Sequence, residues 1–192
     1  MKYYSGRIIE IQLDSYKKYL YKVSLPQELT WQPGQYFNAF IPNDSVHYIP
    51  LTLFPAQFIP ANSKSDTLNL LPFEDVNWQP GIEIQISGPY GKGWQTPPTT
   101  RRLLFLNLTA HFGYLKSFIE WFSSQGFEIS VLTENNSGGL PMDVEVLPIS
   151  ELPEMLTWPD QILADIHRID FPRLEKLVGI PDYLLPSSTS VL

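Results

Sequence analysis

The first half of the chain alternates apolar and polar residues in short runs, a pattern typical of strands that bury one face. Proline, glycine, asparagine and aspartate separate these runs. The pattern predicts six strands, at Ser5–Leu13, Tyr19–Leu25, Gln35–Ile41, Ile49–Phe54, Thr67–Leu71 and Ile82–Ser87. Six short, evenly spaced strands are typical of a small antiparallel barrel or sandwich. We expect a Greek-key-type β barrel over residues 1–97.

The pattern changes after the proline-containing segment Thr96–Thr100. A continuous apolar run at Arg102–Leu108 predicts a strand buried on both faces, and Phe112–Gln125 has apolar residues at helical spacing. Further strands are predicted at Glu128–Leu132, Val144–Leu147 and Gln161–Ile166, and further helices at Leu152–Thr157 and Phe171–Val178. This alternation predicts a reduced Rossmann-like parallel α/β lobe over residues 101–182, followed by a flexible tail at 183–192. Thr109 and Ser150 are candidate caps for the first two helices.

Composition and charge narrow the function classes. The net charge is -7, and the lysines and arginines are scattered, so we expect no nucleic-acid binding. The chain has neither a long apolar run nor the pattern of an export signal, which favours a soluble, cytoplasmic protein without membrane insertion. The absence of cysteine excludes disulfides, thiolate nucleophiles and a cysteine-bound iron–sulfur cluster. His47, His111 and His167 lack the spacing of metal ligands, so we expect no metal site.

A hydrolase is a poor match to the sequence. No Gly-x-Ser-x-Gly segment is present. Asp165 and His167 would share one face of an extended segment, but no nucleophile accompanies them. We therefore expect no catalysis by this pair.

Three glycines and a proline crowd the segment ISGPYGKGW at residues 86–94. Glycine adopts positive φ at little cost and allows another group to approach the backbone closely. The segment therefore predicts either a tight turn after a strand or a backbone that lies against a ligand.

Three segments in order, PGQYFNAFIP, IPLTL and QPGIEIQISGPYGKGW, make the chain resemble the ferredoxin-NADP reductase superfamily. Within it, the chain is most similar to electron-transfer subunits of dihydroorotate dehydrogenase, whose barrel ends in a Gly-Pro-Leu-Gly-x-Gly-Phe segment. The resemblance implies a barrel that binds FAD or FMN and a lobe that binds a nicotinamide nucleotide. It also implies the cofactor-binding residues, which are Tyr48, Pro50, Leu51, Thr52, Gly88, Pro89, Tyr90, Gly91, Gly93 and Trp94.

The chain departs from that family at the flavin phosphate. The family's Arg-x-Tyr-Ser pattern falls on Ile49, Leu51 and Thr52, so that only the hydroxyl is kept. An arginine suits a phosphate because its contacts are charge-assisted and often bidentate, and His47 would be a weak, partly protonated substitute. Leu51 could still cover a flavin ring. The phosphate-binding arginine is therefore expected to be missing.

The second phosphate anchor of the family is a glycine-rich helix start. Here the corresponding stretch between Leu71 and Gln79 reads PFEDVNW, with two carboxylates and no glycine, serine or threonine. Carboxylates next to a diphosphate repel it. A flavin would need other groups, such as Lys92, to replace both anchors.

The nucleotide lobe and the iron–sulfur segment depart as well. After the first strand the family has a glycine-rich turn, whereas residues 109–113 read Thr-Ala-His-Phe-Gly. We therefore expect no NAD(P) binding in the family's manner. The family's four cluster-binding cysteines are absent.

These departures favour a degenerate, non-catalytic accessory or interaction subunit beside a redox enzyme. The alternative is an active flavin-binding electron-transfer subunit with altered phosphate anchors. Aromatic residues make up 14% of the chain, which is compatible with an interface. We expect either another protein subunit or a second copy as the partner.

Overall fold

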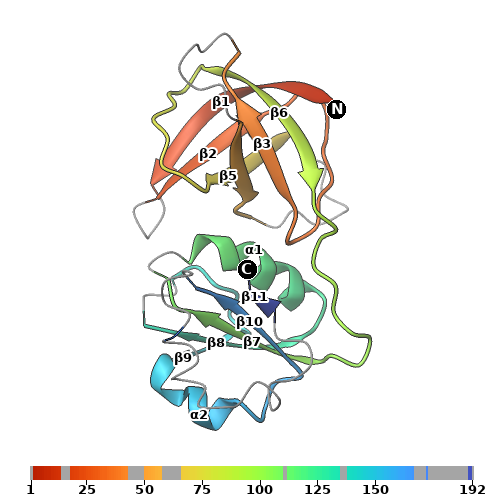
Figure 1. Cartoon of the computed structure of the whole chain (residues 1–192), viewed down its shortest axis with the longest axis vertical. Coiled ribbons are helices and arrows are strands. Elements are labelled where there is room, and N and C mark those ends of the chain that lie inside the picture. The colour runs from red at the N-terminus through yellow and green to blue at the C-terminus, as the bar shows by residue number, and fades with distance from the viewer. Residues whose placement is uncertain are drawn as a thin grey trace. The chain divides into compact units, whose positions relative to one another are not determined.

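The structure is a computed structural model of the whole chain. It describes residues 2–13, 18–42, 50–57, 66–109, 112–134, 138–166, 172 and 190–191. The chain divides into two compact units, the first comprising Met1–Gln95 with Lys116–Phe118 and the second Thr96–Leu115 with Ile119–Leu192. Each unit has its own β-sheet (Figure 1).

The first unit is a closed antiparallel barrel. Its strands are β1 (Tyr3–Leu13), β2 (Tyr19–Ser24), β3 (Tyr36–Phe40), β4 (Leu51–Pro55), β5 (Thr67–Pro72) and β6 (Glu83–Tyr90). Their order around the barrel is β1-β2-β5-β4-β3-β6. Because β3, β4 and β5 follow one another and β6 returns beside β3, the connection is a Greek key. The barrel and its six strands are confirmed.

The barrel core comes from the alternate residues of these strands. Val23, Phe37, Leu53 and Ile84 are completely buried. Burial of each such side chain stabilises the fold by roughly 1.5–3 kcal/mol. The outward residues of the same strands are left to form the barrel surface.

The second unit is a parallel sheet with helices. Its elements are β7 (Arg102–Asn107), α1 (Gly113–Ser124), β8 (Glu128–Thr133), β9 (Glu145–Pro148), η1 (Ile149–Glu151), α2 (Leu152–Met155), β10 (Gln161–Asp165) and β11 (Ser190–Val191). The strand order is β11-β10-β7-β8-β9, and every neighbouring pair is parallel. The predicted parallel α/β lobe is confirmed.

Helices cover both faces of this sheet, as Figure 1 shows. Phe105 packs on Phe122 of α1, with ring centroids 6.1 Å apart. The adjacent residue Leu104 faces the other way and shares a cluster with Leu152 of α2. Since both faces are covered, β7 is buried along almost its whole length, as its apolar run predicted.

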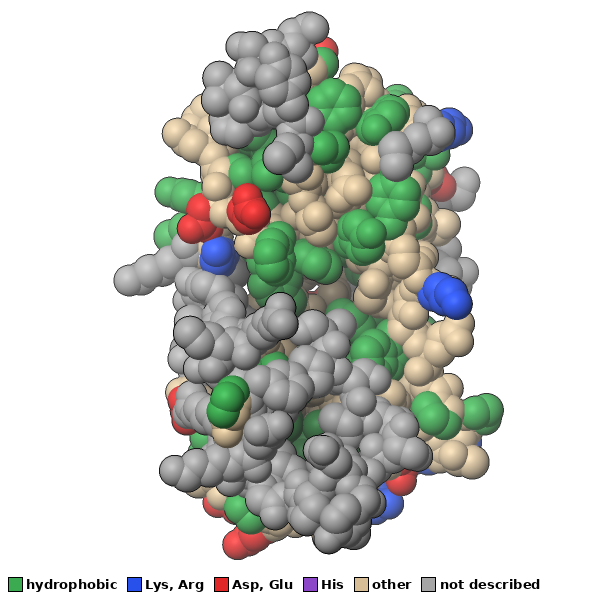
Figure 2. All heavy atoms as spheres, viewed as in Figure 1, with side chains coloured by type: hydrophobic (Ala, Val, Ile, Leu, Met, Phe, Trp, Pro, Cys, Tyr) green, Lys and Arg blue, Asp and Glu red, His purple; other side chains and the backbone are tan. Residues whose placement is uncertain are grey.

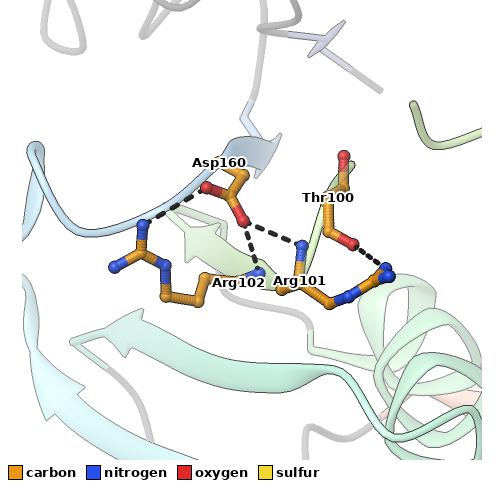
Figure 3. Close-up of polar contacts among 4 residues, drawn as sticks. All are labelled: Thr100, Arg101, Arg102 and Asp160. Atoms are coloured by element: carbon orange, nitrogen blue, oxygen red, sulfur yellow. Dashed lines mark hydrogen bonds and ion pairs between the residues drawn. The ribbon is translucent and has the colours of Figure 1, made fainter. Parts of the chain in front are cut away.

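The amino-terminal ends of β7 and β10 are joined by one carboxylate (Figure 3). Asp160 Oδ2 accepts hydrogen bonds from the backbone N–H groups of Arg101 and Arg102, at 2.8 and 2.9 Å. The Arg102 side chain adds an ion pair to Asp160 at 3.3 Å. These backbone hydrogen bonds lower the pKa of Asp160 below its usual value.

Two predictions of helix caps are corrected. Helix α1 has Phe112 at its N-cap without a side-chain cap, so Thr109 does not cap it. Ser150 lies inside η1, and Glu151 is the N-cap of α2. Ser190 and Val191 form β11 and pair with Leu163 and Ala164 of β10. The predicted helix at 171–178 lies outside the described residues, apart from Pro172.

Candidate functional site

The outer face of β3 and β4 holds the predicted Thr52. Pairing of the two strands places Thr52 opposite Asn38 and Leu51 opposite Ala39. The Thr52 hydroxyl donates to the Asn38 side-chain oxygen, at 3.3 Å. Leu51 is partly buried against the barrel core, so the two predicted residues face opposite ways. Asn38 was missed by the sequence analysis.

Gly88 lies where β6 touches β3. Its φ is +131°, and a Cβ atom there would lie 2.9 Å from Phe37 Cδ1 and 3.0 Å from the Tyr36 carbonyl oxygen. Side chains rarely adopt this φ, and the space is already filled. Contacts with Phe37 and Tyr36, without any ligand, are therefore enough to require glycine at this position.

The rest of the glycine segment packs on the turn that precedes β3. Gln35 Nε2 donates to the Gly91 carbonyl oxygen at 2.9 Å, and the Trp94 N–H donates to the Pro33 carbonyl oxygen at 2.7 Å. A Cβ atom on Gly93 would lie 2.7 Å from Gln32 Oε1. The close neighbour of these glycines is therefore the polypeptide of residues 32–37, which supports the turn interpretation.

A bulge in β6 turns its last residue to the barrel surface. Between the pairs Asn38–Ser87 and Tyr36–Tyr90, β6 contains one more residue than β3. An extra residue reverses the side-chain alternation, so that Tyr90 reaches Tyr36 on the outer face. Their ring centroids lie 5.6 Å apart.

Tyr90 begins a row of four aromatic residues that we call the aromatic band. Tyr36 contacts Phe54 at 6.4 Å, and Phe54 contacts Phe73 at 6.3 Å, between ring centroids. Phe73 is 63% exposed. Figure 2 shows hydrophobic side chains gathered on this unit, on the side where Figure 1 places β3 and β6. The band is an apolar surface beside Thr52 and Asn38.

The segment that follows β5 has no helix between Phe73 and Gln79. Asp75 forms an ion pair with Lys18 at 2.8 Å, and Glu74 is exposed. The buried Trp78 and a hydrogen bond from the Tyr21 hydroxyl to the Val76 carbonyl oxygen, 2.6 Å long, hold the segment on the barrel. Its backbone N–H groups are thus not gathered at a helix start, the usual protein site for a diphosphate.

In the second unit, polar side chains meet at the carboxyl ends of β10, β7 and β8. The Thr109 hydroxyl lies 3.1 Å from Asn107 Oδ1 and 3.2 Å from Asp165 Oδ2, and Asn107 Nδ2 donates to Thr133 Oγ1 at 3.3 Å. All four residues are buried. The chain reverses its strand order here, which is where open α/β sheets usually bind ligands. Thr109 therefore has a structural role, since its hydroxyl links Asn107 and Asp165 within this buried hydrogen-bond network.

Several predicted residues are outside the described part of the chain. These are His47, Tyr48, Ile49, His111 and His167. Pro50 is described and is exposed, and Lys92 is exposed on the glycine segment. Among the described residues, no group of three or more histidine, cysteine or acidic side chains could hold a metal ion. Within the same residues, no helix is long and apolar enough to cross a membrane.

No protein-family model and no curated protein sequence matches the chain. Several solved structures are similar to the chain in fold. The ferredoxin reductase of carbazole 1,9a-dioxygenase, described as an FAD apo form, superposes with a TM-score of 0.67 at 11% identity. The match covers 100% of this chain and 66% of the reductase, so the chain spans about two thirds of that protein's length.

Two further structures match over most of their own length. A siderophore-interacting protein from Acinetobacter baumannii gives a TM-score of 0.68 at 15% identity, covering 100% of this chain and 89% of that one. Ferredoxin-NADP+ reductase from Plasmodium falciparum gives 0.65 at 8% identity, covering 98% and 95%. At such low identity the likeness concerns the fold. The chain shares with these solved structures the fold of a barrel followed by an α/β lobe.

Proposed function

We propose that this protein is a ferredoxin-reductase-like accessory subunit that acts by binding another protein, without carrying electrons on a flavin. The observation that carries the proposal is the absence of a helix in the segment Phe73–Gln79. In the resemblance to the ferredoxin-NADP reductase superfamily, this segment corresponds to the helix start that binds the flavin pyrophosphate. Here it presents Glu74 and the Asp75–Lys18 ion pair in place of a helix start.

The electrostatics of this segment disfavour FAD and FMN. Each exposed carboxylate near a phosphate costs on the order of 1 kcal/mol, about what one good surface contact contributes. Lys18 is already engaged with Asp75. Lys92 would have to supply the phosphate charge without support from a helix start.

The second unit supports the same proposal. Helix α1 begins at Gly113 directly after the bulky, fully buried Phe112. A dinucleotide needs small residues where its diphosphate meets the helix start. Nicotinamide nucleotides are therefore not proposed as ligands.

The aromatic band favours a second candidate, a flavin-binding electron-transfer subunit. Tyr36, Tyr90 and Phe54 offer flat apolar surface beside the hydroxyl of Thr52. In this candidate Thr52 and Tyr90, of the predicted site residues, face the ring, whereas Leu51 lies on the core side of β4. An aromatic contact of this kind contributes about 0.5–1.5 kcal/mol beyond burial. In this candidate, contacts with the flavin ring would have to make up for the loss of both phosphate anchors.

A protein partner fits the kind of protein that this chain resembles in fold. The carbazole 1,9a-dioxygenase reductase is a component of an oxygenase. We propose a comparable redox enzyme as the partner of this chain in the cytoplasm.

The first prediction concerns flavin binding. Protein purified without added cofactor should be colourless, and calorimetric titration should give dissociation constants for FAD and FMN weaker than about 1 mM. Riboflavin, which lacks phosphate, serves as the control for the ring alone. A yellow protein, or a dissociation constant near 1 μM or tighter, would overturn the proposal in favour of the electron-transfer subunit.

A further inference from the structure

The negative charge of this protein is unevenly distributed. Residues 1–95 contain seven Lys or Arg and eight Asp or Glu, whereas residues 96–192 contain six and twelve. No lysine or arginine occurs between residues 117 and 167, where the carboxylates are Glu120, Glu128, Glu134, Asp143, Glu145, Glu151, Glu154, Asp160 and Asp165. Almost all of the net charge therefore belongs to the second half of the chain.

Four of these carboxylates flank one edge of the parallel sheet. Strand β9 is the last strand in the described sheet order, and its one described neighbour is β8. Asp143 precedes β9, Glu145 lies in it, and Glu151 and Glu154 follow it in η1 and α2. Figure 1 shows β9 at the margin of the sheet with α2 next to it. We call the segment from Met142 to Glu154 the acidic edge.

Apolar side chains are exposed within the acidic edge. The exposed fraction is 104% for Met142 and 39% for Val146. A strand edge with exposed apolar side chains presents free backbone groups and can accept a further strand. Charged side chains at a strand edge usually prevent unwanted pairing with other strands. A strand of opposite charge is not repelled, so the carboxylates determine which partners can pair with β9.

Two carboxylates of the acidic edge are hydrogen-bonded to neighbouring elements. The Ser123 hydroxyl lies 3.0 and 2.8 Å from the two oxygens of Asp143, and the Ser130 hydroxyl donates to Glu145 Oε2 at 2.9 Å. Beneath it, Leu147 packs on the cluster that contains Leu152. Side chains that are already held by hydrogen bonds lose less entropy when they bind.

We infer that the acidic edge is the docking surface for an extended segment of the partner protein, in which apolar residues alternate with lysine or arginine. The segment adds beside β9 by backbone hydrogen bonds, its apolar side chains cover Met142 and Val146, and its cations face the carboxylates. This inference rests on the proposed function, because it names the surface by which the accessory subunit binds.

A second copy of this chain is a poorer occupant. A symmetric dimer through β9 would place the same carboxylates against themselves, because a two-fold interface joins identical surfaces. Like charges in contact oppose association. The charge of the edge thus selects a basic partner.

The test uses a fluorescein-labelled peptide of about eight alternating Lys and Val residues, the length of an ordinary strand. A matching peptide of Glu and Val is the control. Anisotropy gives the dissociation constant with the full chain, and amide chemical shifts show where the peptide lies. We expect shifts confined to residues 142–154 and binding that weakens as salt is raised.

Matched variants separate this edge from general attraction. Glu154→Lys should weaken binding about tenfold and Met142→Ser about threefold, whereas Asp66→Lys, the same charge change on the barrel, should alter it less than about twofold. These side chains are exposed, so the variants should fold. Equal weakening by Asp66→Lys, equal binding of the Glu–Val peptide, or shifts spread over the surface would overturn the inference. So would a dimer in light scattering that is abolished by Met142→Ser.

The peptide test and the flavin titration fail independently. A yellow protein that binds the Lys–Val peptide at residues 142–154 would overturn the proposed function and leave the docking surface standing. A colourless protein without peptide binding at this edge would do the reverse.

Discussion

Gly88 occupies a point where two strands of the barrel nearly touch. The positive φ and the close approach of Phe37 exclude a side chain at this position. The bulge that follows also determines where Tyr90 points, and so one end of the aromatic band depends on it.

We predict that Gly88→Ala lowers the free energy of unfolding by about 2–4 kcal/mol, through backbone strain and a steric clash. Gly81→Ala is the control, because Gly81 also has a positive φ, of +92°, but no atom lies within 4 Å of the added Cβ. It should cost only about 1–2 kcal/mol. Urea denaturation measures both values, and equal losses would show that the contact with Phe37 is unimportant.

At the scale of elements, the Asp160 carboxylate links the starts of β7 and β10. Backbone N–H groups of Arg101 and Arg102 lower the pKa of Asp160. A depressed folded-state pKa stabilises the protein above the unfolded pKa, and this contribution is lost as the pH falls through the folded pKa. The link should therefore fail in acid.

We predict that Asp160→Asn destabilises the protein at pH 7, and that the difference from wild type shrinks as the pH falls below the ordinary aspartate value of about 3.9. Urea denaturation at a series of pH values checks this. Glu128→Gln, at the exposed first residue of β8 in the same sheet, is the control and should change stability little at any pH. A difference for Asp160→Asn that is constant with pH would contradict the assignment.

At the scale of the whole molecule, the barrel closes on itself and carries its own core. Closure leaves no strand edge open within it. The predicted domain end at residue 97 can therefore be tested with the barrel alone.

We predict that a fragment of residues 1–97 unfolds cooperatively in urea, with a slope of about 1–2 kcal/mol per molar. A fragment of residues 1–80 lacks β6, which leaves β1 paired only with β2 and β3 paired only with β4, so the barrel cannot close and the fragment should not show a cooperative transition. Circular dichroism and urea titration distinguish the two. If both fragments behave alike, the barrel depends on the rest of the chain.

Local sequence patterns were enough for the elements but not for the site. The strands of the barrel and β7 follow from side-chain periodicity, which is a local property. Thr109 was expected to cap α1 because its type suits a cap, yet the neighbouring strands supply Asn107 and Asp165 as its partners. Asn38 and Phe73 were missed, since their neighbours are distant in the sequence. The contacts of the predicted site residues with a cofactor, and the domain bounds, remain predictions.

By itself, the sequence determined the six barrel strands, the alternation of strands and helices from β7 to β10, the lack of cysteine ligands and the acidic second half, because periodicity and composition are properties of the chain alone. Only the tertiary structure decided the neighbour of the glycine segment, the face reached by Tyr90 and the position of β9 at a sheet edge. These features arise from strand pairing between distant residues, and pairing depends on the register and closure of the whole sheet.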